Sequence, residues 1–325
     1  MNRIFNPFLR LLVMGILAIG HDTTAQQPAT FGAELDALKM QAQKIQRYSY
    51  TATLDRVASK ELIRPDHPED ADYMHQTAMI SFNAWDKKVL SDVNFYYKQG
   101  KAMLTSGKSS YDGEFWTWYE YHGSVLFISK KKRPPRSYIV SGVFPLALPY
   151  GFVNLQNDSC NTNPTFPVDL LNDAGWEYVR QNAVLISSDE QVARFFLAGK
   201  DIEISANYLD EVTIDKATKI PIELRRYKAE HGQKEYMTYQ LKVIKIKKLE
   251  RNGKNFFYPQ VIEASKYAGP DPGENEKPGT FQYKDTFTVT NLELLETEDI
   301  DFSTDPTIAK AIFDVDRQVW ISIPK

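Results

Sequence analysis

The chain has 325 residues, 42% hydrophobic, 25% charged and 13% aromatic, a globular composition that excludes a wholly disordered or collagen-like protein. Its formal net charge of -3 is close to neutral, so we expect no nucleic-acid partner. The single cysteine, Cys160, can form no internal disulfide and no multi-thiolate zinc site, and we interpret it as a tolerated lone thiol.

Residues 1–25 are expected to be a secretory signal peptide. Arg3 and Arg10 precede an apolar run at residues 11–20, and small residues lead to Ala25. This run is shorter than the about 20 residues of a transmembrane helix, although an uncleaved anchor stays open as an alternative. No cysteine lies near the expected cleavage point, as a lipoprotein anchor would require. We therefore expect a periplasmic protein, exported, neither a lipoprotein nor transmembrane, with residues 26–325 as one domain.

Residues 30–46 are predicted to form an amphipathic helix, since Leu35, Leu38, Ala42 and Ile45 recur every three or four positions. From Tyr48 the hydrophobic period changes to two, which is typical of a half-buried strand. Further strands of this kind are predicted at short intervals, at residues 73–85, 89–97, 101–106, 115–121 and 125–129. Because the connections are short, neighbouring strands should be antiparallel.

Residues 130–175 are predicted to be a loop-rich insertion with a short helix at 167–172, and a domain boundary there stays open. The insertion begins with the basic run Lys130–Arg136, interpreted as a solvated loop, with contact to anionic headgroups or a partner as the alternative. Strands are then predicted at residues 184–188, 192–197, 201–206, 211–215, 220–227, 235–248, 256–267, 280–295 and 318–323. A loop at 268–279 and a short helix at 306–313 complete the chain.

Roughly a dozen antiparallel strands need closure or cover, and a strongly twisted open sheet tends to curl. The sequence therefore predicts an α+β fold. Its centre would be a curved antiparallel half-barrel of roughly a dozen strands, with helices covering the concave face. Apolar side chains would line that face, and a cavity could remain there.

Two short motifs occur in a fixed order, a strand at residues 111–119 and a hairpin at residues 212–227. Their distinctive residues are Asp112, Gly113, Trp116, Trp118, Asp215, Thr218, Pro221 and Tyr227. Together with the acidic-aromatic segment 299–302, this order resembles the LolA/LolB-like superfamily of periplasmic lipoprotein carriers and the outer membrane lipoprotein-sorting relatives. Lys219 stands where that family often has glycine. The resemblance implies a half-barrel with a helical lid, an apolar cavity for acyl chains, no catalysis and no cofactor.

Aromatic residues are the main candidates for a ligand surface. Trp116 and Trp118 share one face of their strand, and Trp85 ends a neighbouring strand. Such side chains usually pack a core, but a cavity for lipid chains requires the same apolar lining. The candidate ligand-binding residues are Phe82, Trp85, Trp116, Trp118 and Phe127. The expected ligands are lipid or lipoprotein acyl chains, with a membrane-associated protein as a further partner.

Motifs of catalysis and metal binding are missing from the sequence. There is no G-x-S-x-G, no H-E-x-x-H and no phosphate-binding glycine loop, so we expect no metal, no cofactor and no enzyme. Two alternatives stay open. One is an envelope protein-interaction or sensor module on the same sheet, and the other is a secreted hydrolase with a carboxylate pair, for which Glu211, Asp215 and Glu223 lie on one hairpin.

Overall fold

The computed structural model describes the parts of the chain that form its regular elements. These are residues 29–43, 47–60, 75–85, 88–97, 103–120, 125–130, 146, 149–150, 173–201, 206–230, 233–251, 253–268, 277–303 and 309–321. The predicted signal peptide, Cys160, the helix expected at 167–172 and most of the 130–175 insertion lie outside these ranges. Within them, no helix has both the length and the apolar character needed to cross a membrane.

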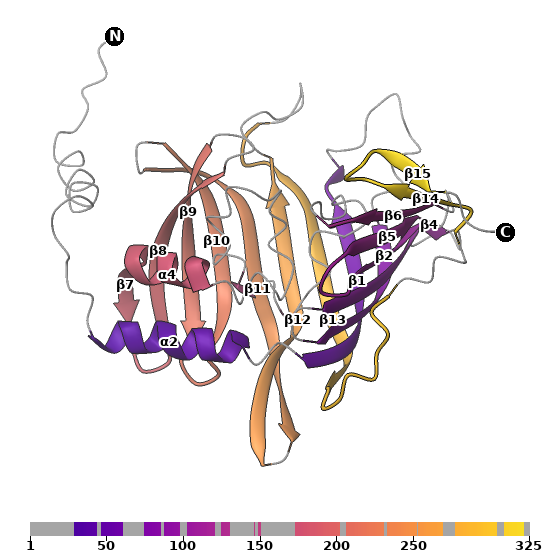
Figure 1. Ribbon diagram of the computed structural model, residues 1–325. Helices are drawn as coiled ribbons and strands as arrows, with labels where there is room; N and C mark the ends of the chain where they lie inside the picture. Colours follow the sequence, from indigo (N-terminus) through magenta and orange to yellow (C-terminus); the bar gives the residue numbers. More distant parts are fainter. Residues whose placement is uncertain are drawn as a thin grey trace, which may run out of the picture.

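Fifteen strands form one open sheet (Figure 1). Their order is β15-β14-β6-β5-β4-β3-β2-β1-β13-β12-β11-β10-β9-β8-β7. The strands are β1 Arg47–Ala58, β2 His75–Trp85, β3 Lys88–Tyr97, β4 Met103–Tyr111, β5 Trp116–Glu120, β6 Val125–Ser129, β7 Val184–Ser188, β8 Val192–Asp201, β9 Ala206–Asp215, β10 Ile220–Glu230, β11 Gln233–Arg251, β12 Lys254–Tyr267, β13 Phe281–Leu294, β14 Ala311–Asp314 and β15 Val319–Ile321. Strands that follow each other both in the chain and in the sheet pair antiparallel. Strand β1 pairs with both β2 and β13, and so joins the half that contains β2–β6 to the half that contains β7–β13.

The predicted β-rich fold is confirmed, with three corrections. The strands number fifteen, more than the expected dozen. The sheet is mixed, because β14 lies parallel to β6. The helix expected at 306–313 is wrong where the chain is described: Ile312 and Phe313 belong to β14, whose side chains pack onto β6 and β15. Helix α4, Asp173–Asn182, was not predicted from the sequence.

Alternation of side chains gives the sheet two unlike faces. On the face that we call the inner face, strands β1–β3, β5 and β8–β13 contribute buried apolar residues, such as Tyr50 on β1, Phe82 on β2, Leu241 on β11 and Phe195 on β8. These residues belong to one buried cluster that extends from β5 to β8. The opposite, outer face carries polar residues such as Thr51, which contacts Thr290 across the β1–β13 pair.

Helix α2, Ala29–Gln43, packs on the inner face through its apolar stripe (Figure 1). The ring of Phe31 lies 5.7 Å from that of Phe195 on β8. Two polar contacts fix the helix further: Gln41 Nε2 donates to the backbone oxygen of Phe257 at 2.9 Å, and Glu34 pairs with Lys216 at 3.0 Å. The helix is therefore held by side chains at a few points.

The turn of the β9–β10 hairpin has a backbone conformation at Lys219 that glycine adopts without strain. Lys219 has a φ of 58°, which is the left-handed region. The turn is fixed by Asp215, whose carboxylate accepts from the Thr218 backbone N–H at 2.8 Å and from its hydroxyl. Lysine is strained there because its Cβ crowds the backbone, which costs about 1–2 kcal/mol relative to glycine.

We expect Lys219→Gly to raise the free energy of unfolding by up to about 1 kcal/mol, since the relief of strain exceeds the added chain entropy of glycine. Ala217→Gly in the same turn is the control, and it should lower stability by about 0.5–1 kcal/mol because Ala217 has no positive φ to relieve. Urea unfolding measures both. Equal changes in the free energy of unfolding for the two substitutions would contradict backbone strain at Lys219.

The two faces also predict unlike effects at adjacent positions of β8. Phe195 is fully buried beneath α2, whereas Phe196 is half-buried on the outer face. Phe195→Ala should lower the free energy of unfolding by about 3–5 kcal/mol, because it opens a cavity in the core. Phe196→Ala should cost about 1 kcal/mol. Urea denaturation of both variants checks the assignment of faces, and a reversed order of the two losses would refute it.

Candidate functional site

An aromatic row crosses the inner face toward one edge of the sheet. Trp118 on β5 stacks on Phe127 on β6 with ring centroids 5.4 Å apart. Phe127 meets the edge of Phe313 on β14 at 6.1 Å, and Phe313 contacts Trp320 on β15 at 4.9 Å. Trp118 is buried, but Trp320 is 63% exposed. The row thus leads from the core to an exposed edge strand.

Two other candidate residues lie in the same buried cluster with different partners. Phe82 on β2 packs against Tyr48 at 5.6 Å and Tyr50 at 5.3 Å. Trp116 stacks on Tyr111 at 4.7 Å. Burial raises the pKa of the Tyr48 hydroxyl well above its ordinary value, and this hydroxyl has no hydrogen-bond partner among the described residues. Four of the five candidates therefore belong to one apolar face.

The fifth candidate, Trp85, lies on the other face. The buried residues of β2 include Phe82 and Ala84, so Trp85 has the opposite parity. It pairs in register with Arg47, whose guanidinium lies 4.6 Å from the centre of the Trp85 ring. Trp85 is consequently not positioned to line the inner face with Phe82.

A row of polar residues crosses the inner face from β9 to β13. Five of its members are consecutive cross-strand partners on neighbouring strands. In order from β9 to β13 these are Asp210, Arg226, Tyr239, Lys266 and Tyr283. Together with Tyr208, Arg56 and Asp285, which extend the same region on β9, β1 and β13, we call them the inner polar strip.

Two bidentate ion pairs lie at the two ends of the strip, with Tyr239 and Lys266 between them. Arg226 donates from Nε and Nη2 to the two oxygens of Asp210, both at 2.8 Å. Arg56 donates in the same way to Asp285, at 2.7 and 2.8 Å. This fork geometry gives strong, charge-assisted hydrogen bonds and fixes both guanidinium planes.

Each guanidinium also lies over a tyrosine ring. Arg226 is 4.3 Å from the ring centre of Tyr208, and Arg56 is 4.3 Å from that of Tyr283. Gly199 on β8 makes room for the first stack, because a Cβ there would come within 2.5 Å of the Tyr208 ring. The absence of a side chain at Gly199 thus supports the position of Arg226 through Tyr208.

The surroundings of the strip keep both arginines charged. Burial lowers the pKa of Arg226, but the charge and hydrogen bonds of Asp210 outweigh it, so the pKa lies above its ordinary value. The same balance with Asp285 raises the pKa of Arg56. Burial raises the pKa of Tyr239 far above neutral pH, so its phenol remains protonated. The strip therefore combines ionised pairs with neutral phenol groups.

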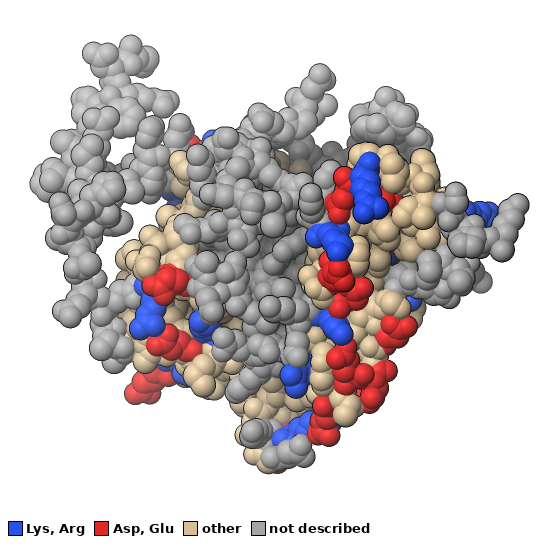
Figure 2. All heavy atoms as spheres, in the orientation of Figure 1, with Lys and Arg blue, Asp and Glu red and all other residues tan. Residues whose placement is uncertain are grey.

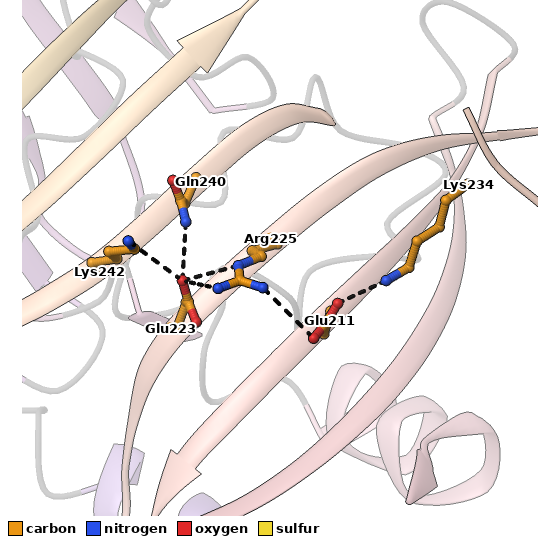
Figure 3. Close-up of polar contacts among 6 residues, drawn as sticks. All are labelled: Glu211, Glu223, Arg225, Lys234, Gln240 and Lys242. Atoms are coloured by element: carbon orange, nitrogen blue, oxygen red, sulfur yellow. Dashed lines mark hydrogen bonds and ion pairs between the residues drawn. The ribbon is translucent and has the colours of Figure 1, made fainter. Parts of the chain in front are cut away.

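Two of the three acids considered for a hydrolase, Glu211 and Glu223, lie in an ion-pair lattice on the outer face (Figure 3). Arg225 connects them, with Nη2 2.8 Å from Glu223 and Nη1 4.0 Å from Glu211. Lys234 pairs with Glu211 at 2.7 Å, and Gln240 donates to Glu223 at 3.0 Å. Asp215, the third acid, holds the β9–β10 turn. Each of these carboxylates thus has a structural partner.

Charge elsewhere is mixed. Figure 2 shows acidic and basic side chains alternating in a band down one side of the visible face, which is consistent with a net charge of -3. In the ranges that the structure describes, no group of three or more His, Cys, Asp or Glu side chains is placed to hold a metal ion. Comparison with models of known protein families gives no match, and comparison with curated proteins also gives none.

Sequence reasoning missed the inner polar strip, although its signal is present. Asp210 has the same strand parity as the buried Val212 and Ile214, and Arg226 has that of the buried Leu224. A charged residue at a buried parity requires a partner, because an unpaired buried charge is costly. Opposite charges at buried parity on the two strands of one hairpin therefore predict their pairing.

We expect Arg226→Gln to lower the free energy of unfolding by about 3–5 kcal/mol, because it leaves the buried Asp210 carboxylate unpaired. The double variant Asp210→Asn with Arg226→Gln should recover most of this loss, since a neutral pair replaces the ionic one. The outer-face control, Arg225→Gln, should cost less than about 1 kcal/mol. Urea unfolding of the wild type, the two single variants Asp210→Asn and Arg226→Gln, the double variant and the control tests the pairing, and single-variant losses that simply add in the double variant would contradict it.

Proposed function

We propose that the protein is a non-enzymatic carrier that holds lipid or lipoprotein acyl chains against the inner face of its sheet. The observation that carries the proposal is the one-sidedness of the sheet. Apolar and aromatic side chains form one cluster from β5 to β8, whereas the outer face of β9–β11 carries a lattice of ion pairs. An apolar surface with few polar groups is what an acyl chain requires.

Helix α2 supplies the movable part of this proposal. Its apolar stripe belongs to the same cluster as the sheet, so the helix and an acyl chain would compete for the same surface. Besides the burial of Phe31, Leu35, Leu38 and Ala42 in that cluster, its contacts include the Gln41 hydrogen bond, the Glu34–Lys216 ion pair and the Asp36–Arg180 ion pair. We infer that α2 covers the concave face as a lid and moves when a ligand enters. Each buried methylene would contribute about 0.8 kcal/mol before ordering costs.

The resemblance to the LolA/LolB-like superfamily agrees with this function. In the hairpin that carries part of the resemblance, Asp215 fixes the turn before Lys219. Trp116 and Trp118 lie on the inner face within the buried cluster. An exported, periplasmic location belongs to the same proposal, because it rests on the predicted signal peptide.

An envelope interaction module is the second candidate, favoured by one observation. Edge strand β15 exposes Val319, Trp320 and Ile321, which are 45%, 63% and 39% accessible. An unpaired edge with apolar side chains can pair with a strand of another chain. Val319→Lys changes the edge strand on the side away from the aromatic row, so it should leave acyl binding unchanged and abolish such pairing, which separates the two functions.

Quenching of tryptophan fluorescence by a brominated acyl chain tests the carrier function, because bromine quenches only at contact. The probe is the methyl ester of dibromostearic acid, which carries no charge. We expect saturable quenching that is mostly lost in Trp118→Phe with Trp116→Phe and retained in the matched outer-face control Trp85→Phe. Native mass spectrometry of detergent-free protein should also show a bound lipid.

The proposal fails if the folded protein, shown by its near-UV circular dichroism, retains no lipid and is not quenched by the probe. It also fails if Trp85→Phe removes the quenching and the double variant does not. Stable association of the lipid-free protein with a defined envelope partner through β15 would instead support the interaction module.

A further inference from the structure

The inner polar strip lies on the face proposed to hold acyl chains, and its buried charges and accessible charges differ in sign. Its carboxylates are hidden: the side chain of Asp210 is 0% exposed and that of Asp285 is 6% exposed. Its cations are within reach, since Arg226 is 27% and Arg56 is 22% exposed, and Lys266 is an exposed residue. A ligand on this face therefore meets positive charge.

The accessible cations are held in place before any ligand arrives. The carboxylates fix the two guanidinium planes by bidentate hydrogen bonds, and the rings of Tyr208 and Tyr283 lie over their faces. A bidentate carboxylate occupies two of the five N–H donors of each guanidinium, so further donors remain. Lys266 lies 5.8 Å from the Tyr283 ring, beside the second pair. Cationic groups fixed in this way bind anions without a large ordering cost.

Stability alone does not account for the strip. Buried ion pairs return little net stability, because desolvation of both ions offsets their attraction, and apolar residues of similar volume often serve as well. Apolar partners are available on this face: Leu224 and Leu241 face each other in register, two positions along the strands from Arg226 and Tyr239. The ionic residues therefore stand where an apolar continuation of the core would fit the surroundings.

We propose that the inner polar strip binds the anionic headgroup of the acyl ligand, so that the protein selects acidic amphiphiles over neutral ones. This inference rests on the proposed carrier function. The headgroup chemistry is a carboxylate or phosphate oxygen that accepts hydrogen bonds from Arg226, Arg56 and Lys266. The acyl chain would extend from the strip over the apolar inner face.

Displacement of the neutral fluorescent probe N-phenyl-1-naphthylamine from the full chain tests the inference. The competitors are dodecanoate, dodecyl phosphate, dodecanol and inorganic phosphate, at neutral pH and below their micellar concentrations. We expect at least one of the two anionic amphiphiles to bind at least about tenfold more tightly than dodecanol, as charge-assisted hydrogen bonds are stronger than neutral ones. Inorganic phosphate should not displace the probe.

Variants assign the selectivity to the strip. Asp210→Asn with Arg226→Gln removes the charges without leaving a buried ion alone, and it should reduce the preference for the anionic amphiphile about tenfold. The matched outer-face variant, Glu223→Gln with Arg225→Gln, should leave the preference unchanged. Lys266→Gln changes an exposed residue, so it tests the strip even if the first variant does not fold. It should weaken the binding of the anionic amphiphile and leave the binding of dodecanol constant.

The outcomes separate this inference from the proposed function. Equal binding of dodecanol and both anionic amphiphiles overturns the headgroup site and leaves the acyl carrier standing. Failure of the protein to bind the fluorescent probe or any amphiphile overturns both. If inorganic phosphate displaces the probe and the anionic amphiphiles do not, the assignment of an amphiphile headgroup is overturned, and the site binds a free anion. Loss of selectivity in the outer-face variant, but not in the strip variants, also overturns the assignment.

Discussion

The structure depends on one constraint: across the described sheet, the strands from β5 to β8 must bury one face consistently, while a smaller cluster around Tyr119 and Leu126 covers the other face at β5 and β6. Register pairing carries this constraint from strand to strand, because a slip of one residue would turn every side chain to the opposite face. The pairs of β1 illustrate it, since Tyr50 faces Phe82 on one side and Leu292 on the other, and all three are buried. The position of α2 follows from the same constraint, since its apolar stripe completes the burial of β8 through Phe31 and Phe195.

Charge follows the same division, and the exceptions to it are informative. On the outer face, Arg225 shares its hydrogen bonds with Glu223 among partly exposed neighbours, where an ion pair contributes little to stability. Arg226, one residue further along β10, faces inward and pairs with a fully buried carboxylate. The two adjacent arginines therefore have different surroundings. Arg225 belongs to a solvated ion-pair lattice, and Arg226 is fixed within an apolar surface.

The strands were largely predictable, because alternation is a local property of the sequence. Strands β6 and β7 were predicted with the bounds that the structure gives, and the hairpin around Asp215 was predicted from its turn residues. The inward parity of Phe82 was predictable in the same way, and the same count of residues places Trp85 on the other face. Strand β14 was not predicted, although it forms a hairpin with the adjacent β15. Its other partner, β6, lies far away in sequence, and local periodicity gives no indication of that second pairing.

The inner polar strip shows why a site is harder to predict than a strand. Arg56 and Asp285 are separated by 229 positions and meet only because β1 pairs with β13. The Arg226–Asp210 pair lies within one hairpin, yet its position beside Tyr239, Lys266 and Tyr283 depends on the register of three further strands. Gly199 matters for a similar reason, because the ring of Tyr208 from the next strand fills the space that a side chain at Gly199 would need. An apolar face that contains such a cluster is divided into a charged end and an apolar end. Under the proposed carrier function, a ligand that matches both ends must itself be amphiphilic, and the division of the face would then orient it.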